Sequence, residues 1–171
     1  MAAITHGHPS GYLAAGVLAS VIFLIRKGDG LKSAIDRSLE ILKTKKGHEE
    51  CETAILNALE KSRAGEPSPE RLEELGQGWV AEEALAISLY CSLCHETDFS
   101  KGVLLAVNHS GDSDSTGAIT GNILGLKLGK KGIPETWIRD LELKNVIEQI
   151  ALDLYLPNQM DDLWWEKYPG Y

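Results

Sequence analysis

The residues of this sequence that are best suited to chemistry lie in the polar segment 108–117. Asp112 and Asp114 are separated by one residue, and the hydroxyl side chains of Ser115 and Thr116 follow them. Carboxylate and hydroxyl oxygens are the hard ligands that Mg²⁺ binds, usually while it keeps several of its waters. Small residues follow from Gly117 onward, so a ligand or another helix can approach the backbone closely. Residues 112–115 are therefore a candidate cation site.

Two other interpretations fit the same residues. Asp114 or Ser113 could cap the helix that follows, which is the commoner role of an aspartate in front of a helix. The spacing also matches the first half of an EF-hand calcium loop, but Ile123 stands where that loop requires a bidentate glutamate. The residues alone exclude an EF-hand and leave both a cap and a cation site open.

Helices are expected to position this segment, because apolar residues recur along most of the chain at helical spacing. The pattern predicts helices over residues 12–26, 31–43, 49–63, 69–76, 80–95, 100–107, 115–128 and 141–155. Residues 12–26 are apolar on nearly every side, which predicts a central, buried helix. No segment alternates with a period of two. The prediction is an all-α fold that forms one compact domain over residues 1–171.

Composition limits the classes of partner and compartment. The net charge is −8, which argues against nucleic acid because its binders need clustered cations. Three cysteines do not make a disulfide framework, which favours a reducing cytoplasm. The longest apolar run, residues 12–25, is too short to span a bilayer and is interrupted by Gly16 and Ser20. We therefore expect a soluble cytoplasmic protein that binds neither nucleic acid nor membrane.

One set of histidine and cysteine residues offers an alternative metal site, for zinc. His48, Cys51, Cys91 and Cys94 are suitable ligand types. Both pairs fall within predicted helices, however, where thiols usually behave as small apolar groups. We interpret these cysteines as core residues.

Several other residues have a structural interpretation at least as good as a functional one. Glu82 and Glu83 open a predicted helix, where the macrodipole favours acids. Trp79 suits the core as well as a ligand pocket. An apolar tail surface, which predicts docking on the body or on another chain, is formed by Trp164, Trp165, Tyr168 and Tyr171.

Three blocks of the sequence resemble ADP-ribosylglycohydrolases. Residues 110–118, Ser-Gly-Asp-Ser-Asp-Ser-Thr-Gly-Ala, are similar to the Gly-Gly-Asp-Thr-Asp-Thr signature of that family. Residues 4–9, Ile-Thr-His-Gly-His-Pro, are similar to its Thr-His-x-x-Pro block. Residues 75–85 are similar to its Gly-x-Gly-Trp-x-Ala-Glu-Glu-Ala block. The blocks agree in order and spacing. The resemblance covers residues 4 to about 156 and leaves the tail from about residue 157 unmatched.

The resemblance implies roles for individual residues. Asp112 and Asp114 match two aspartates that bind Mg²⁺ in the family, and Ser115 stands where a hydroxyl ligand, usually threonine, follows them. The residues implied to contact ADP-ribose, or to form a loop beside it, are His6, Leu75, Gly76 and Gly78. The family's helical enzymes hydrolyse the bond that links ADP-ribose to a protein side chain or to another ADP-ribose unit. Their paired metals position the attacking water.

The resemblance also implies what this chain lacks. The family's other metal ligands lie upstream, in an N-terminal half with a Thr-Asp-Asp triplet and an acidic residue that assists catalysis. The only adjacent aspartates of this chain, Asp161 and Asp162, lie in the unmatched tail. We therefore expect the C-terminal half of the fold, a split or truncated gene product with no catalytic residue assigned. Its expected partner is a separate N-terminal half or a second copy of the chain.

Three classes of function follow. The first is a hydrolase that removes ADP-ribose from a modified substrate such as an ADP-ribosylated protein, by Mg²⁺-assisted attack of water, and that is incomplete as an isolated chain. The alternatives are a non-catalytic protein that binds ADP-ribose and a self-associating scaffold derived from the same family. The Asp112 and Asp114 loop favours descent from an active enzyme, whereas the missing ligands favour the alternatives for this chain alone.

Overall fold

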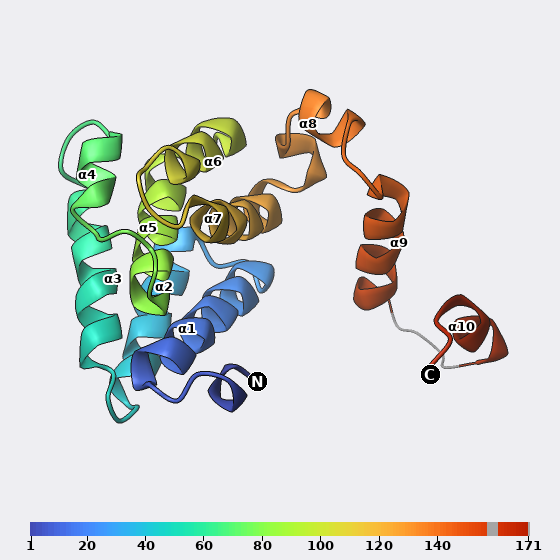
Figure 1. Ribbon diagram of the computed structural model, residues 1–171, viewed down its shortest axis with the longest axis horizontal. Helices are drawn as coiled ribbons and strands as arrows, with labels where there is room; N and C mark the ends of the chain where they lie inside the picture. The colour runs from blue at the N-terminus through green and yellow to red at the C-terminus, as the bar shows by residue number, and fades with distance from the viewer. Residues whose placement is uncertain (157–160, 171) are drawn as a thin grey trace. The chain divides into compact units, whose positions relative to one another are not determined.

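The computed structural model describes residues 1–156 and 161–170, and within them it contains helices and no strand (Figure 1). The predicted all-α fold is thereby confirmed. The chain forms two compact units, Met1–Pro134 and Glu135–Tyr171. The two units are described separately below, and the prediction of a single domain stays a prediction.

The first unit follows the predicted helices closely. Its elements are η1 (Ala2–Ile4), α1 (Pro9–Arg26), α2 (Leu31–Lys43), α3 (Glu49–Lys61), α4 (Pro69–Glu73), α5 (Ala81–Cys94), α6 (Phe99–Val107), α7 (Ser113–Leu128) and η2 (Lys130–Gly132). Local signals account for several boundaries. Ser68 caps α4 by accepting a hydrogen bond from Arg71 N (3.4 Å), and Pro69 occupies the first helical position. Asp98 caps α6 in the same way.

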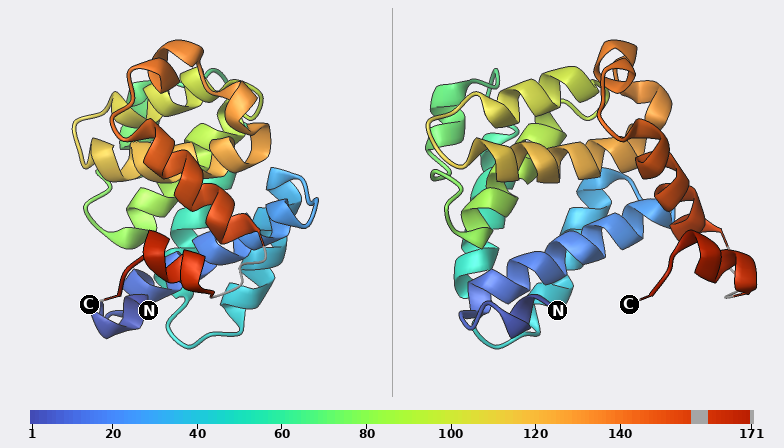
Figure 2. Two further views of the ribbon diagram at one scale, coloured as in Figure 1. Left: turned by 90° about the vertical axis from the view of Figure 1, so that its right-hand side faces the viewer. Right: turned by 45° about the vertical axis from the view of Figure 1, so that its right-hand side comes forward.

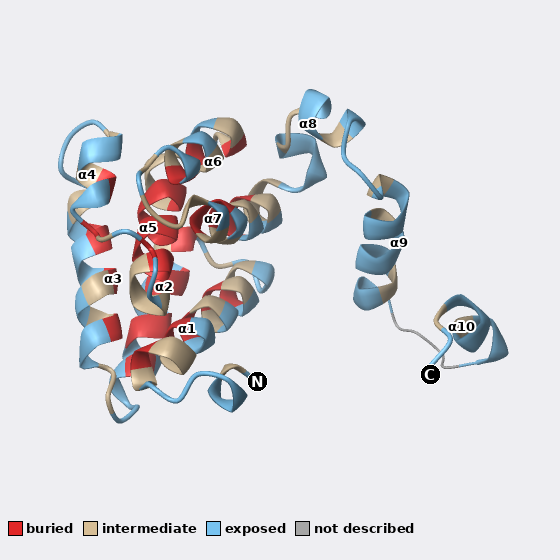
Figure 3. Ribbon diagram, in the orientation of Figure 1, coloured by how far each residue is buried: buried red, intermediate tan, exposed pale blue. Residues whose placement is uncertain are grey.

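The central helix of this unit is α5, not α1 as predicted. Every residue from Ala84 to Ser92 is buried, and α5 packs against α1, α3, α6 and α7 (Figure 3). Its apolar side chains contribute to two hydrophobic clusters, one shared with α1 and α2 and one shared with α3 and α4. A helix enclosed on every side needs small or apolar residues around its whole circumference, and the Ala- and Leu-rich sequence of α5 meets that need.

Helix α1 has only one buried face, although its sequence is apolar nearly all round. Its buried positions are Ser10, Ala14, Val17, Val21 and Leu24. On another face, the Phe23 side chain is 57% exposed. The helix is 18 residues long, so by length and composition alone it could cross a membrane, as the core helices of many soluble proteins could. The helix is longer than the apolar run of residues 12–25, which by itself is too short to span a bilayer.

Helices α6 and α7 lie side by side (Figures 1 and 2) and approach each other closely through glycines. A Cβ atom on Gly102 would lie 2.3 Å from Leu124 Cδ1, and one on Gly117 would lie 2.6 Å from Val107 Cγ1. The small residues that follow the Asp112 segment thus serve helix packing in part, which was one of the two roles predicted for them.

The second unit contains α8 (Glu135–Arg139), α9 (Lys144–Tyr155) and α10 (Asp162–Lys167). Asp153 of α9 accepts a hydrogen bond from Tyr168 Oη (2.6 Å) and lies 2.5 Å from Lys167 Nζ. The bond from Lys167 first, and then the bond from Tyr168, hold the pKa of Asp153 below its usual value. These contacts join α10 to α9. Tyr171, named above for the tail surface, lies outside the described residues.

Candidate functional site

The loop between α4 and α5 is shaped by one carboxylate. Gly76 and Gly78 adopt φ angles of +111° and +79°, which residues with side chains rarely adopt. The backbone N–H groups of Gln77 and Gly78 both donate to Glu83 Oε2, at 3.0 and 3.1 Å. The helix dipole therefore does not fully explain the glutamate at position 83, because the Glu83 carboxylate also binds the loop that precedes its own helix.

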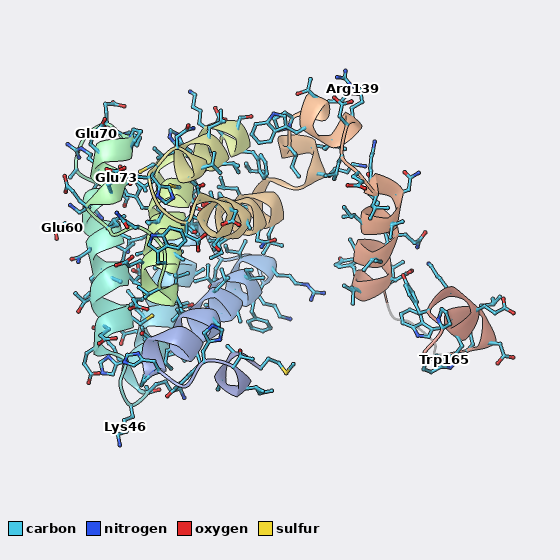
Figure 4. The ribbon with its side chains drawn as sticks, viewed as in Figure 1. Lys46, Glu60, Glu70, Glu73, Arg139 and Trp165 are labelled. Atoms are coloured by element: carbon cyan, nitrogen blue, oxygen red, sulfur yellow. The ribbon has the colours of Figure 1, made fainter. Side chains whose placement is uncertain are left out.

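The loop before α7 lies directly on the loop before α5. Asp112 N donates to Gln77 O at 2.7 Å. A Cβ atom on Gly111 would lie only 1.8 Å from the same oxygen, so no side chain fits at this position. Ser110 N donates to Glu73 Oε1 (3.2 Å), and Glu73 closes α4 (Figure 4). Backbone groups of residues 110–112 thus bind residues 73 and 77, which are far away in the sequence.

His109 and Thr116 hold the second loop from within. His109 Nδ1 accepts from Gly111 N (3.1 Å), so the neutral ring carries its proton on Nε2, 3.0 Å from Thr116 Oγ1. Thr116 Oγ1 in turn donates to Ala106 O (2.7 Å) at the end of α6. Sequence analysis assigned His109 no role. A histidine between a helix end and a glycine is the only signal that could have drawn attention to it.

The two aspartates occupy the start of α7, which begins at Ser113 rather than at the predicted Ser115. Asp112 is the N-cap residue, yet its side chain makes no capping hydrogen bond. Asp114 is exposed, and its Oδ1 accepts from Ser115 N at 2.8 Å. Its pKa is lowered, first by a hydrogen bond with the Asp112 side chain and then by that Ser115 N–H. The capping interpretation therefore does not account for the Asp112 side chain.

A cavity of about 790 Å³ joins the three sequence blocks. Its lining includes His6 from the first block, Gly78 from the second, and Asp112 and Ser115 from the third. The volume lies within the range of small-molecule sites, roughly 300–1,000 Å³. The cavity thus brings together four residues that the sequence placed in one site.

Three other predicted site residues do not line this cavity. Gly76 and Asp114 lie outside its lining, and Leu75 is only 8% exposed and belongs to the core beside α3 and α5. Gly76 instead acts through the loop, because a Cβ atom there would lie 2.3 Å from Glu83 Cδ. The predicted ligand contacts of Leu75 and Gly76 stay predictions.

The remaining walls are mostly apolar, with a few polar groups among them. Ala14, Leu18, Leu85 and Ile119 contribute from α1, α5 and α7. The lining also includes His8, Trp79 and Glu82. Trp79 is 67% exposed, and its Nε1 donates to Gln77 Oε1 at 3.2 Å. This exposure contradicts the alternative prediction that Trp79 is a core residue.

The donors at the start of α7 suit a hydrated cation but form a small set. Two carboxyl groups close enough to share a hydrogen bond are close enough to share a cation, and the Ser115 hydroxyl lies on the same turn. Among residues 1–156 and 161–170, no group of three or more His, Cys, Asp or Glu side chains could hold a metal ion. A cation here would keep most of its waters.

The cysteines behave as core residues. Cys51 and Cys91 are buried, and Cys94 is partly buried. Burial raises the pKa of all three thiols, that of Cys51 to about 11. A thiolate is the form that binds zinc, so this environment disfavours the zinc alternative.

Comparison with known proteins identifies the family. The family model described as ADP-ribosylglycohydrolase matches residues 1–163. The chain belongs to this family. The ADP-ribosylhydrolase ARH3 of Bos taurus is 26% identical over 186 aligned residues, which cover 90% of this chain and 49% of that protein. ARH3 of Homo sapiens is also 26% identical and covers 90% of this chain and 50% of its own length.

Bacterial relatives match a shorter part of the chain. The ADP-ribosylarginine hydrolase Tri1 of Pseudomonas putida (strain GB-1) is 26% identical over 101 residues, which are 58% of this chain and 27% of that protein. No solved structure matches this chain. The chain thus spans about half the length of its ARH3 relatives and about a quarter of Tri1.

The contact between the two loops can be tested at Gly111. Gly111→Ala should destabilise the fold by about 1–3 kcal/mol, because the new methyl group collides with backbone atoms of Gln77 that cannot rotate away. Thermal unfolding followed by circular dichroism measures the change. Gly16→Ala is the matched control: nothing lies within 4 Å of its Cβ position, and alanine favours the interior of α1. An equal melting temperature for Gly111→Ala and wild type would contradict the close contact.

Proposed function

We propose that this chain supplies the ADP-ribose-binding and cation-binding half of an ADP-ribosyl hydrolase. In this proposal the ADP-ribose group occupies the cavity lined by His6, Gly78, Asp112 and Ser115. Mg²⁺ is held by Asp112, Asp114 and Ser115. The substrate is an ADP-ribosylated molecule, as the names of the ARH3 and Tri1 relatives state for those proteins.

One observation carries the proposal: three sequence blocks of a hydrolase family converge on a single cavity of suitable size. His6 and Asp112 are more than a hundred positions apart, so chance clustering in the sequence does not explain their meeting. The apolar walls suit a ring system, while the carboxylates of Asp112 and Glu82 in the lining suit hydroxyls of a ribose.

The residues of the chain have distinct tasks in this proposal. Asp112 lines the cavity and its side chain makes no capping hydrogen bond, so its carboxylate can orient a cation or accept a hydrogen bond from a ribose hydroxyl. His6 and the exposed face of Trp79 bound the entrance and limit the approach of water. A bound Mg²⁺ would supply charge that stabilises the substrate and the attacking water.

The donor set supports a further element of the proposal, namely that turnover requires groups from outside this chain. Two carboxylates and one hydroxyl leave a divalent ion largely hydrated. The chain also spans only about half of ARH3. The missing donors would come from the part of the family's fold that these 171 residues do not span.

A self-associating scaffold is the second candidate, and exposed apolar side chains favour it. Phe23 on α1 is 57% exposed. On α9, Val146, Ile147 and Leu154 are 50%, 48% and 81% exposed. Such side chains are usually covered by a partner when they are contiguous.

The cation site is tested by titration calorimetry with Mg²⁺. Wild type should bind weakly, and Asp112→Ala/Asp114→Ala should lose the binding heat because both carboxylates are removed. The matched control is Asp36→Ala/Asp140→Ala, which removes two aspartates that form ion pairs elsewhere. Equal binding by wild type and the Asp112→Ala/Asp114→Ala variant would move the site elsewhere.

Catalysis is tested by release of ADP-ribose from an ADP-ribosylated protein. The isolated chain should release none with excess Mg²⁺, because opposing carboxylates that stabilise charge and position water are missing. A complementing N-terminal half from the same genome should restore turnover, and Asp112→Ala should then abolish it. Turnover by the lone chain that survives Asp112→Ala would refute the site. Binding of ADP-ribose without turnover in any combination would favour the non-catalytic alternative.

Self-association is tested by light scattering over a wide range of protein concentrations. Wild type should form a dimer or a larger species, and Phe23→Ser should weaken association if the exposed face of α1 is buried in it. Ile41→Ser is a suitable control, since Ile41 of α2 is similarly exposed at 51% but lies on a different helix. A strictly monomeric, well-folded wild type at high concentration would exclude this candidate.

A further inference from the structure

We infer that Glu83 is a positioning residue that sets the direction of Asp112 from the first turn of α5, by way of the Gln77–Gly78 backbone. Nothing in the resemblance assigns this glutamate a role in the site. Glu83 acts on the geometry of the loops before α5 and α7. Only the expected effect on Mg²⁺ affinity rests on the proposed function.

The first step is that Glu83 fixes the loop Gly76–Gly78, called the glycine loop below. A single oxygen, Oε2, accepts from two successive backbone N–H groups, at 3.0 Å from Gln77 N and 3.1 Å from Gly78 N. An ionised acceptor makes such bonds about twice as strong as a neutral one does. The carboxylate also lies so close to the loop that no side chain fits at Gly76, where a Cβ atom would lie 2.3 Å from Glu83 Cδ. The conformation of Gly76–Gly78 therefore depends on this side chain.

The second step leads from the loop to the aspartate. The Gln77 carbonyl and the Gly78 N–H belong to one planar peptide unit. Because Glu83 fixes that N–H, the Gln77 oxygen on the opposite side of the unit is directed to Asp112 N, which donates to it at 2.7 Å. Gly111 lies against the same oxygen with no room for a side chain. Gly78 is fixed in turn against the start of α7, since its Cβ position is 3.1 Å from Thr116 Cγ2 and 3.7 Å from Asp112 Cβ. Movement of the glycine loop must then move Asp112.

The neighbouring glutamates do not share this role. Glu49, Glu50, Glu74, Glu82 and Glu83 line one acidic groove. Of these, Glu83 is the one whose carboxylate accepts from the Gln77 and Gly78 amides. Glu82, the preceding residue on α5, lines the cavity as well as this groove. A general effect of negative charge in the groove can therefore be separated from the specific effect of Glu83.

The test is residue-resolved amide hydrogen exchange by NMR on the full chain, for wild type, Glu83→Ala, Glu83→Gln and Glu49→Ala. Glu49→Ala removes one charge from the same groove without touching the loop. Exchange at Gln77, Gly78 and Asp112 should be roughly tenfold faster in Glu83→Ala, because an accepted hydrogen bond and its charge are lost. Glu83→Gln keeps an accepting oxygen and should recover part of the protection. Ile35, buried in α2, reports global unfolding and should be unchanged.

Two outcomes overturn the inference. Asp112 exchange that stays at the wild-type rate while Gln77 and Gly78 accelerate would show that the loop does not direct Asp112. An equal acceleration in Glu49→Ala, or one matched by Ile35, would show a charge or stability effect. If Glu83→Ala does not fold, Glu83→Gln decides alone: faster exchange at Asp112 with unchanged Ile35 supports the inference, and unchanged exchange at Asp112 refutes it.

Calorimetry with Mg²⁺ separates this inference from the proposed function. If wild type binds Mg²⁺, the affinity should fall in Glu83→Ala, fall less in Glu83→Gln, and stay unchanged in Glu49→Ala. Loss of affinity in Glu49→Ala equal to that in Glu83→Ala would contradict the inference. If wild type binds no Mg²⁺, the proposed cation site fails, whereas the exchange rates at Asp112 still decide the role of Glu83.

Discussion

The hydrogen bond from Asp112 N–H to the Gln77 carbonyl joins two loops that the sequence separates by more than thirty residues. Gly111 makes the bond possible, because any side chain there would overlap the same carbonyl. On one side of this contact Glu83 holds the glycine loop, and on the other His109 and Thr116 hold the start of α7. The two loops meet beside the cavity, and α1, α5 and α7 provide its apolar walls.

The sequence predicted the helices well, since apolar periodicity reports which face of a helix is buried. It failed for the relative placement of α1 and α5. Both helices are apolar on nearly every side, and such a pattern shows no preferred face. What decides the outcome is packing: α5 has neighbours around its whole circumference, whereas α1 leaves Phe23 exposed. Periodicity within one segment contains no information about the number of its neighbours.

The candidate site was predictable only in part, for a related reason. Motif resemblance placed His6, Gly78, Asp112 and Ser115 together, and they share one cavity. The same motif gave no way to distinguish Leu75, whose side chain is in the core, from Gly78, which lines the cavity. Nor could it separate Glu82 from Glu83, because adjacent residues on a helix point about 100° apart and only the tertiary structure shows what lies in each direction.

The wall of the cavity nearest the N-terminus differs from the others in local stability. Ala2, His6 and His8 line the cavity, yet η1 contains no buried residue and His6 contacts only its neighbour Thr5 through a side-chain hydrogen bond. Few buried contacts mean that this segment opens at a small free-energy cost compared with α5. Any ligand that touches it must pay the entropy of ordering it, and will protect it from proteolysis in return. Occupancy of the cavity by a ligand that touches residues 1–8 would therefore be thermodynamically linked to the order of this segment.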